Sequence, residues 1–185
     1  MSSITLDHLL AACRPGGASV LTSVTLLQPA AGPHASVAPA KFTERGNSVF
    51  AYERRFWEGK AVDAVLIDSK QSQNNRLEAA VSAAITDGDE VLSAMPRIEL
   101  RFEDGQAYSD IDLPHRAFDG QIRAGTINGE PATASPDYRA LRDATVSHAR
   151  ALIERSPMTL LLGGWDASRK SNQGRYRSIL VGEII

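Results

Sequence analysis

A short apolar run that stops at an aspartate and passes directly into an amphipathic helix constrains the fold of this chain most. Residues 61–68, AVDAVLID, have the length and composition of a buried strand. The polar stretch after Asp68 contains neither glycine nor proline. Apolar residues then recur at helical spacing, namely Leu77, Val81, Ala84 and Ile85. The junction therefore predicts a strand followed by a helix, and Asp87-Gly88 marks the end of that helix.

Further elements follow this junction along the chain. Residues 97–111 alternate apolar and polar side chains around Asp104-Gly105, which is the clearest hairpin signal in the sequence. Ser135-Pro136 predicts the start of a helix that runs to Arg155. Thr5 is predicted to cap a short helix that ends at Pro15, Gly16 and Gly17. Residues 18–27 and 158–165 read as strands.

The order of these elements suits an α+β fold of the ferredoxin-like or RNA-recognition-motif type, with a sheet layered against helices. A doubly wound α/β fold is the alternative.

Charge and composition narrow the class of protein. The formal net charge is −2, so the total charge alone predicts no nucleic-acid partner, but residues 163–178 carry four bases against one acid. Cys13 is the only cysteine, which excludes a disulfide framework within one chain. No stretch approaches the length of a membrane span, and the N-terminus lacks the features of a signal peptide. We expect a cytoplasmic protein that does not bind a membrane.

Amides, hydroxyls and cations gather at the start of the helix after Asp68. A helix N-terminus presents unpaired N–H groups and a positive dipole end, so it favours a phosphate group. Together these side chains suit a sugar-phosphate backbone, whose recognition does not read the bases. The candidates are Lys70, Gln71, Ser72, Asn74, Asn75 and Arg76. An ordinary helix capped by Ser69 or Ser72 explains the same residues without a ligand.

A second polar cluster, GGWDASRKSNQGRYR, spans residues 163–177. Its glycines allow a close approach of backbone to ligand, its cations suit phosphate, and Trp165 and Tyr176 offer rings for stacking. The cations are Arg169, Lys170, Arg175 and Arg177. His115, Arg116 and Arg123 are weaker candidates for phosphate contacts. No P-loop sequence is present, and a solvated surface loop beside a core tryptophan is the alternative reading.

Two aspartates raise the question of catalysis. Asp68 and Asp166 each follow a predicted strand, where a carboxylate can bind a metal ion. Aspartates in such places are more often helix or turn caps, and no serine or cysteine nucleophile lies in a recognisable elbow. We therefore expect no catalytic residue, no metal and no cofactor. A metal-dependent ribonuclease and a binder of a small phosphorylated ligand remain alternatives.

Four stretches together resemble one known family. They are residues 38–53, 65–81, 113–125 and 158–184, and the most specific is VLIDSKQSQNNRLEAAV at 65–81. They resemble the backbone subunit of the type I-U (also called I-G) CRISPR Cascade effector complex, a member of the RAMP superfamily. The resemblance runs over nearly the whole chain.

The resemblance implies a modified RNA-recognition fold with inserted lobes, so we expect one domain over residues 1–185 with insertions at 28–47 and 97–134. It implies a subunit that coats the CRISPR RNA (crRNA), polymerises with copies of itself in a helical filament, contacts other Cascade subunits and presents the spacer for pairing with target DNA. In related subunits a hairpin or loop wedges between nucleotides, and both insertions are candidates for it. Family members continue beyond the VGEII at which this sequence stops, so we expect a truncated or unusually short version.

Overall fold

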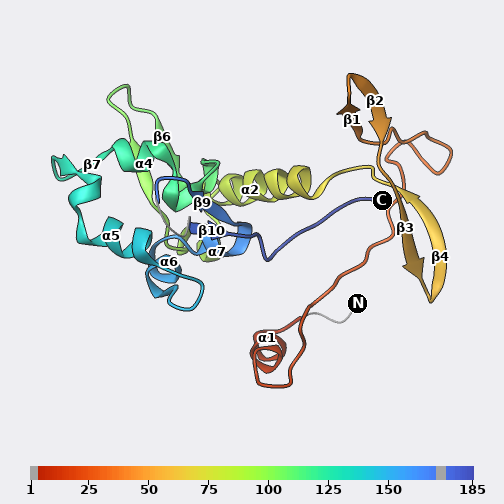
Figure 1. Cartoon of the computed structure of the whole chain (residues 1–185), viewed down its shortest axis with the longest axis horizontal. Coiled ribbons are helices and arrows are strands. Elements are labelled where there is room, and N and C mark those ends of the chain that lie inside the picture. The colour runs from red at the N-terminus through yellow and green to blue at the C-terminus, as the bar shows by residue number, and fades with distance from the viewer. Residues whose placement is uncertain (1–3, 170–173) are drawn as a thin grey trace. The chain divides into compact units, whose positions relative to one another are not determined.

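A computed structural model describes residues 4–169 and 174–185 of the chain (Figure 1). Contacts between residues divide the chain into two compact units, which we call the N-terminal unit (Met1–Val37) and the main unit (Ala38–Ile185). Each unit is described by itself. The predicted single domain with insertions stays a prediction.

The N-terminal unit contains one helix, α1 (Leu6–Ala12), among its described residues. Thr5 caps it, and a reciprocal bond with His8 completes a capping box, as the sequence predicted for the cap. The predicted strand at residues 18–27 is wrong for this structure, because the segment is assigned no regular element. A β-branched sequence becomes a strand only when another strand pairs with it, and the described residues supply none.

Among residues 38–169 and 174–185, the main unit holds ten short strands in five antiparallel pairs. Pairs are formed by β1 (Lys41–Glu44) with β2 (Asn47–Phe50), β3 (Tyr52–Trp57) with β4 (Lys60–Val65), β5 (Glu99–Arg101) with β6 (Ala107–Ser109), β7 (Thr126–Ile127) with β8 (Glu130–Pro131), and β9 (Gly164–Asp166) with β10 (Gly174–Tyr176). The β5–β6 hairpin confirms the signal at Asp104-Gly105.

Helices connect these pairs. The α-helices are α2 (Lys70–Thr86), α3 (Glu90–Ser93), α4 (Gly120–Ala124), α5 (Pro136–Asp143), α6 (Arg150–Arg155) and α7 (Pro157–Leu162), and the 3₁₀ helices are η1 (Asp110–Asp112), η2 (Arg116–Phe118) and η3 (Ala132–Ala134). This mixture confirms the predicted α+β class. Every described pair is antiparallel, which argues against the doubly wound alternative. A continuous RNA-recognition-like sheet stays a prediction, since the described strands join two by two.

Two further sequence-based element predictions differ from the structure. Residues 158–162 form α7 rather than a strand, because Pro157 occupies the first helical position and Met158 and Leu162, four residues apart, are both buried. The predicted helix from Pro136 to Arg155 is two helices, α5 and α6. Ala144 ends α5, and its carbonyl accepts hydrogen bonds from the Tyr176 hydroxyl at 2.7 Å and from Arg169 at 3.3 Å.

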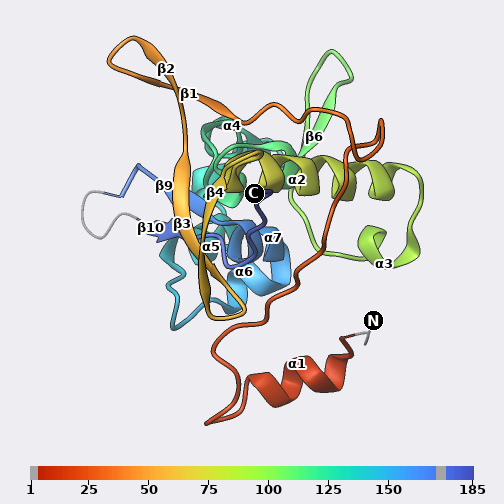
Figure 2. The ribbon, with the colours of Figure 1, turned by 90° about the vertical axis from the view of Figure 1, so that its right-hand side faces the viewer.

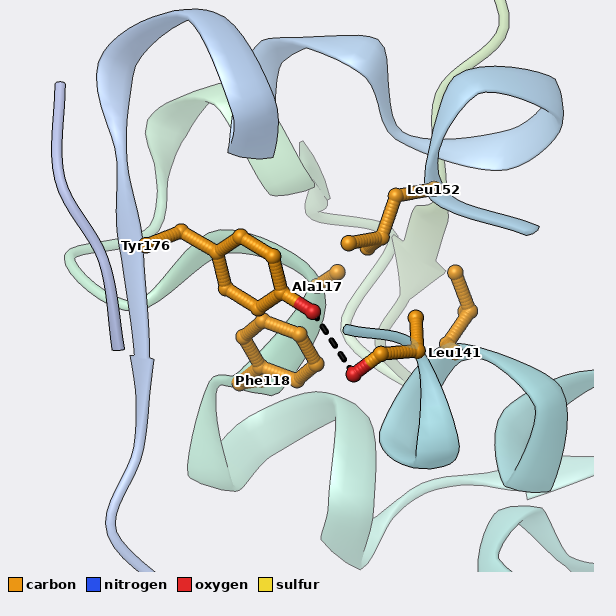
Figure 3. Close-up of a cluster of buried hydrophobic side chains, with 6 residues drawn as sticks. Ala117, Phe118, Leu141, Leu152 and Tyr176 are labelled. Carbon is orange, nitrogen blue, oxygen red and sulfur yellow. Dashed lines mark hydrogen bonds between the residues drawn. The ribbon is translucent and has the colours of Figure 1, made fainter. Parts of the chain in front are cut away.

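The largest buried cluster lies where α5, α6, η2 and β10 meet (Figure 3). The Tyr176 ring stacks on Phe118 with ring centroids 5.5 Å apart, and its hydroxyl points at the Ala144 carbonyl. Ala117, Leu141 and Leu152 complete the cluster. Much of this core therefore comes from residues 110–122 and 138–176, and it fixes the position of β9 and β10.

A buried polar network supports the same region. The Asp110 carboxylate accepts hydrogen bonds from the Ile98 amide at 3.1 Å and from the Ser156 hydroxyl. Ser156 also bonds Thr159 at 2.6 Å, and Thr159 accepts from the Ala117 amide at 3.2 Å. Burial raises the pKa of Asp110, although these hydrogen bonds oppose the rise. The network joins the hairpin, α7 and η2 in one rigid piece.

Candidate nucleic-acid interface

A surface pocket of about 350 Å³ opens beside β9 and β10. Its lining comes from the segment before η2, from the turn between α7 and β9, and from β10 with the residues after it: Pro114, His115, Arg116, Leu162, Gly163, Gly164, Trp165, Arg175, Tyr176, Arg177 and Ser178. Sequence segments some 50 residues apart therefore build one site. The structure thus brings together His115 and Arg116 with the second predicted cluster.

A tryptophan lies at the centre of this pocket. The Arg175 guanidinium lies over the Trp165 ring, 5.3 Å from its centroid, and the His115 ring approaches edge-on at 5.7 Å. The register of β9 and β10 places Arg175 directly opposite Trp165. The indole N–H of Trp165 is buried and has no hydrogen-bond partner among the described residues. The pocket therefore presents an aromatic ring and a cation within one concave surface, while the indole N–H stays buried behind it.

Arg116 has a different place from the one the sequence suggested. Its side chain is buried, donates a hydrogen bond to the Gly163 carbonyl at 2.7 Å, and forms an ion pair with Glu78 of α2. The predicted phosphate contact of Arg116 stays a prediction. In this structure its guanidinium connects α2 to the turn that leads into β9.

The glycines of the second cluster serve backbone packing rather than an open ligand surface. Gly163 has φ +87°, and a Cβ atom there would lie 2.7 Å from the Tyr176 carbonyl oxygen. At Gly174 a Cβ atom would lie 2.8 Å from the Arg169 guanidinium carbon. Position 163 needs glycine because of its positive φ and the close backbone of β10, whereas the contact at Gly174 is to the end of a flexible arginine side chain.

The first predicted cluster begins α2, as expected. The Ser69 hydroxyl accepts from the Ser72 amide at 3.2 Å, which confirms Ser69 as the cap. Lys70, Gln71 and Asn75 are exposed. The Lys70 ammonium lies 3.9 Å from Glu183, so its charge is partly balanced.

Asp68 contacts two side chains in the first turns of α2. Its carboxylate accepts a hydrogen bond from the side-chain amide of Gln73 at 2.5 Å and forms an ion pair with Arg76 at 3.0 Å. Hydrogen bonds from Ser72 and Gln73, together with the Arg76 charge, lower the pKa of Asp68. Arg76 is therefore exposed but already paired with a carboxylate.

The C-terminal residues connect the two predicted clusters. The side-chain amide of Asn74 donates a hydrogen bond to the Ser178 hydroxyl at 3.0 Å, and Ser178 lines the pocket. Farther along, the backbone of Ile184 pairs with that of Asp68 in an isolated antiparallel bridge. The two clusters are joined by the segment after β10, which runs back along the start of α2.

The remaining predicted contacts are dispersed. Arg123 is exposed on α4, and Arg177 is exposed at the pocket. Arg169 turns inward, pairing with Asp166 at 3.0 Å and lying over the Phe118 ring. Lys170 lies outside the described residues. Sequence reasoning missed Glu78 and Ser178. Neither lies in a recognisable motif, and each contacts a residue far away in the sequence, Arg116 and Asn74 respectively.

The two aspartates considered for catalysis are both engaged by neighbours. Burial would raise the pKa of Asp166, but hydrogen bonds from Ser168 and Arg169 outweigh it and lower the pKa. Within residues 4–169 and 174–185, no group of three or more His, Cys, Asp or Glu side chains converges on a possible metal position. Among the helices of those same ranges, none is long and apolar enough to cross a membrane.

Comparison with known proteins gives one match. A family model described as CRISPR-associated protein GSU0053 matches residues 21–185, which is most of the chain. Neither a curated protein nor a solved structure matches significantly.

Proposed function

The chain belongs to the family described as CRISPR-associated protein GSU0053, and from that premise we propose that it is a crRNA-binding backbone subunit of an interference complex. In this proposal copies of the chain polymerise along the guide RNA in the cytoplasm, together with other subunits of a type I-U/I-G Cascade. The subunit presents the spacer for pairing with target DNA and does no catalysis itself. Sequence is then read by base pairing, while the protein holds the RNA backbone.

One observation carries the proposal: the Trp165 pocket and the start of α2 adjoin through the Asn74–Ser178 hydrogen bond. The pocket offers a ring with a cation above it, which suits a nucleobase and its phosphate. The helix start offers exposed polar side chains and a positive dipole end, which suit the next phosphates.

The charges of the two regions favour backbone contact. Arg175 and Arg177 are exposed at the pocket, and Lys70 is exposed at the helix start. Each cation that neutralises a phosphate releases counterions, so binding should weaken steeply with salt and depend little on sequence. The Lys70–Glu183 and Arg76–Asp68 pairs are both exposed enough for a phosphate to compete with the carboxylate.

The test compares RNA affinities by fluorescence anisotropy at several salt concentrations. We expect the double variant Lys70→Ala/Arg175→Ala to bind two unrelated spacer RNAs more weakly than the wild type does, with the same loss of affinity for both. Its plot of log affinity against log salt should be shallower by about 1 to 2 units, one for each lost phosphate contact. Arg150→Ala, an exposed arginine on α6 outside both candidate insertions, is the matched control and should change neither quantity. A loss confined to one spacer, or an unchanged slope, contradicts backbone recognition.

The absence of catalysis in this proposal has its own test. The assembled complex is incubated with RNA complementary to the spacer in the presence of Mg²⁺. We expect the RNA to remain intact. Regularly spaced cuts that Asp68→Ala or Asp166→Ala abolishes would instead establish the ribonuclease alternative.

A further inference from the structure

Residues 18–27, ASVLTSVTLL, have a strand-forming sequence but no strand partner. We call them the donor segment. None of their backbone N–H or C=O groups takes part in a hydrogen bond among the described residues. Backbone groups of a strand are normally paired within a sheet, so the donor segment has a full row of hydrogen-bonding groups available.

The side chains of the donor segment are as exposed as its backbone. In an extended strand Val20, Val24 and Leu26 lie on one face, because successive side chains alternate. They are 70%, 69% and 87% exposed. No described side chain of the N-terminal unit is buried, so this unit has no core of its own. Apolar surface of this extent indicates a contact with another protein surface.

The donor segment contains no charged residue. An RNA backbone is therefore a poor occupant, because its affinity comes from Lys and Arg contacts to phosphate. An apolar strand edge is the complementary surface.

The main unit offers an open strand edge at β3 that carries two exposed aromatic rings, with Arg54, paired to Asp63, between them. The β3–β4 hairpin forms a two-stranded ribbon (Figure 2). No described strand pairs with the outer edge of β3. Tyr52 and Phe56 lie on one face of β3, and they are 73% and 75% exposed. An added strand with Val20, Val24 and Leu26 on that same face would cover both rings.

We propose that the donor segment adds as a β-strand to the outer edge of β3 in a second copy of this chain. This inference rests on the proposed function, which has copies polymerise along one RNA, and it names the element that joins them. Neighbouring copies on one RNA raise the local concentration of the acceptor edge. Residues 28–40, with three prolines, span about 40 Å when extended, which allows the segment to reach a neighbour.

Sedimentation of the full chain without RNA tests the donor face. We expect Val24→Glu/Leu26→Glu and, separately, Phe56→Glu to weaken self-association at least about tenfold, because each places carboxylates against an apolar surface. Ser23→Glu/Thr25→Glu is the matched control, since it adds the same two charges to the opposite face of the same strand, and we expect no change. Self-association of the donor variant equal to that of the wild type overturns the inference, as does an equal loss in the control.

Mixing tests whether the contact runs between copies. The donor variant keeps a good β3 edge, and the Phe56→Glu variant keeps a good donor segment. Native mass spectrometry should therefore show one-to-one heterodimers in the mixture, while each variant alone is monomeric. Monomers in the mixture would overturn exchange between copies.

Hydrogen exchange gives a readout that needs no variant. Amide protection of residues 18–27 in the wild type should rise with protein concentration. Protection that is independent of concentration, or no protection at any concentration, overturns the inference.

Failure of the proposed function is distinguishable from failure of this inference. Wild-type chain that binds no RNA but associates through the donor segment refutes RNA binding and supports strand addition. Chain that binds a short RNA normally when Val24 and Leu26 are replaced, and that associates as the wild type does, supports RNA binding and refutes strand addition.

Discussion

Replacing Glu78 by alanine should destabilise the main unit far more than a surface substitution does. Arg116 is 7% exposed, and Glu78 is 22% exposed. Without Glu78 the buried guanidinium keeps only the Gly163 carbonyl as a partner among the described residues, and its Nε is already without one. Breaking a buried pair costs several kcal/mol, and the partial exposure of Glu78 places the cost at about 3 kcal/mol.

Urea denaturation followed by circular dichroism measures this cost. For a chain of this size about 3 kcal/mol corresponds to a fall of about 6–12 °C in melting temperature. Glu154→Ala is the matched control, because it breaks the exposed Arg150–Glu154 pair and should cost at most about 0.5 kcal/mol. The double variant Glu78→Leu/Arg116→Met should recover much of the loss, since no charge is then left buried. Equal costs for Glu78→Ala and Glu154→Ala would refute the role assigned to Arg116.

Three further predictions concern single side chains. Trp165→Ala should weaken RNA binding by about 1–3 kcal/mol in anisotropy titrations while leaving the salt slope unchanged, because it removes stacking but no cation. The pKa of Asp166 is lower in the folded chain than its ordinary value of 3.8. The ionised carboxylate therefore stabilises the fold at any pH above 3.8, and this stabilisation is lost as the pH falls through the pKa of the folded state. The stability advantage of the wild type over Asp166→Asn in urea titrations should therefore be larger at about pH 7 than at about pH 3. Asn74→Ala should cost about 1 kcal/mol in unfolding free energy through loss of the bond to Ser178, and an unchanged midpoint would contradict that bond.

Local signals in the sequence predicted the parts of the fold that depend on neighbours along the chain. Thr5 and Ser69 cap their helices, Asp104-Gly105 turns a hairpin, and Ser135-Pro136 starts α5. Each depends on contacts within a few residues, which the sequence displays directly.

Contacts across long sequence separations decided the parts that were not predicted. The carbonyl of Ala144 is held by Tyr176, 32 residues away, and this bond accompanies the division of the expected helix in two. Arg116 and Glu78 meet across 38 residues, so a side chain read as a phosphate contact is buried in an ion pair. The candidate site was assembled in the same way, since Trp165 was identified from its local cluster but its neighbour His115 lies 50 residues earlier.

The chain contains two tryptophans, and the structure gives them separate surroundings. Trp165 sits in the pocket between Arg175 and His115, while Trp57 is the last residue of β3 and is half exposed. Intrinsic fluorescence therefore provides two built-in optical reporters. With Trp57→Phe, emission comes from the pocket alone and should respond to RNA; with Trp165→Phe, it comes from the hairpin alone and should respond to association between copies.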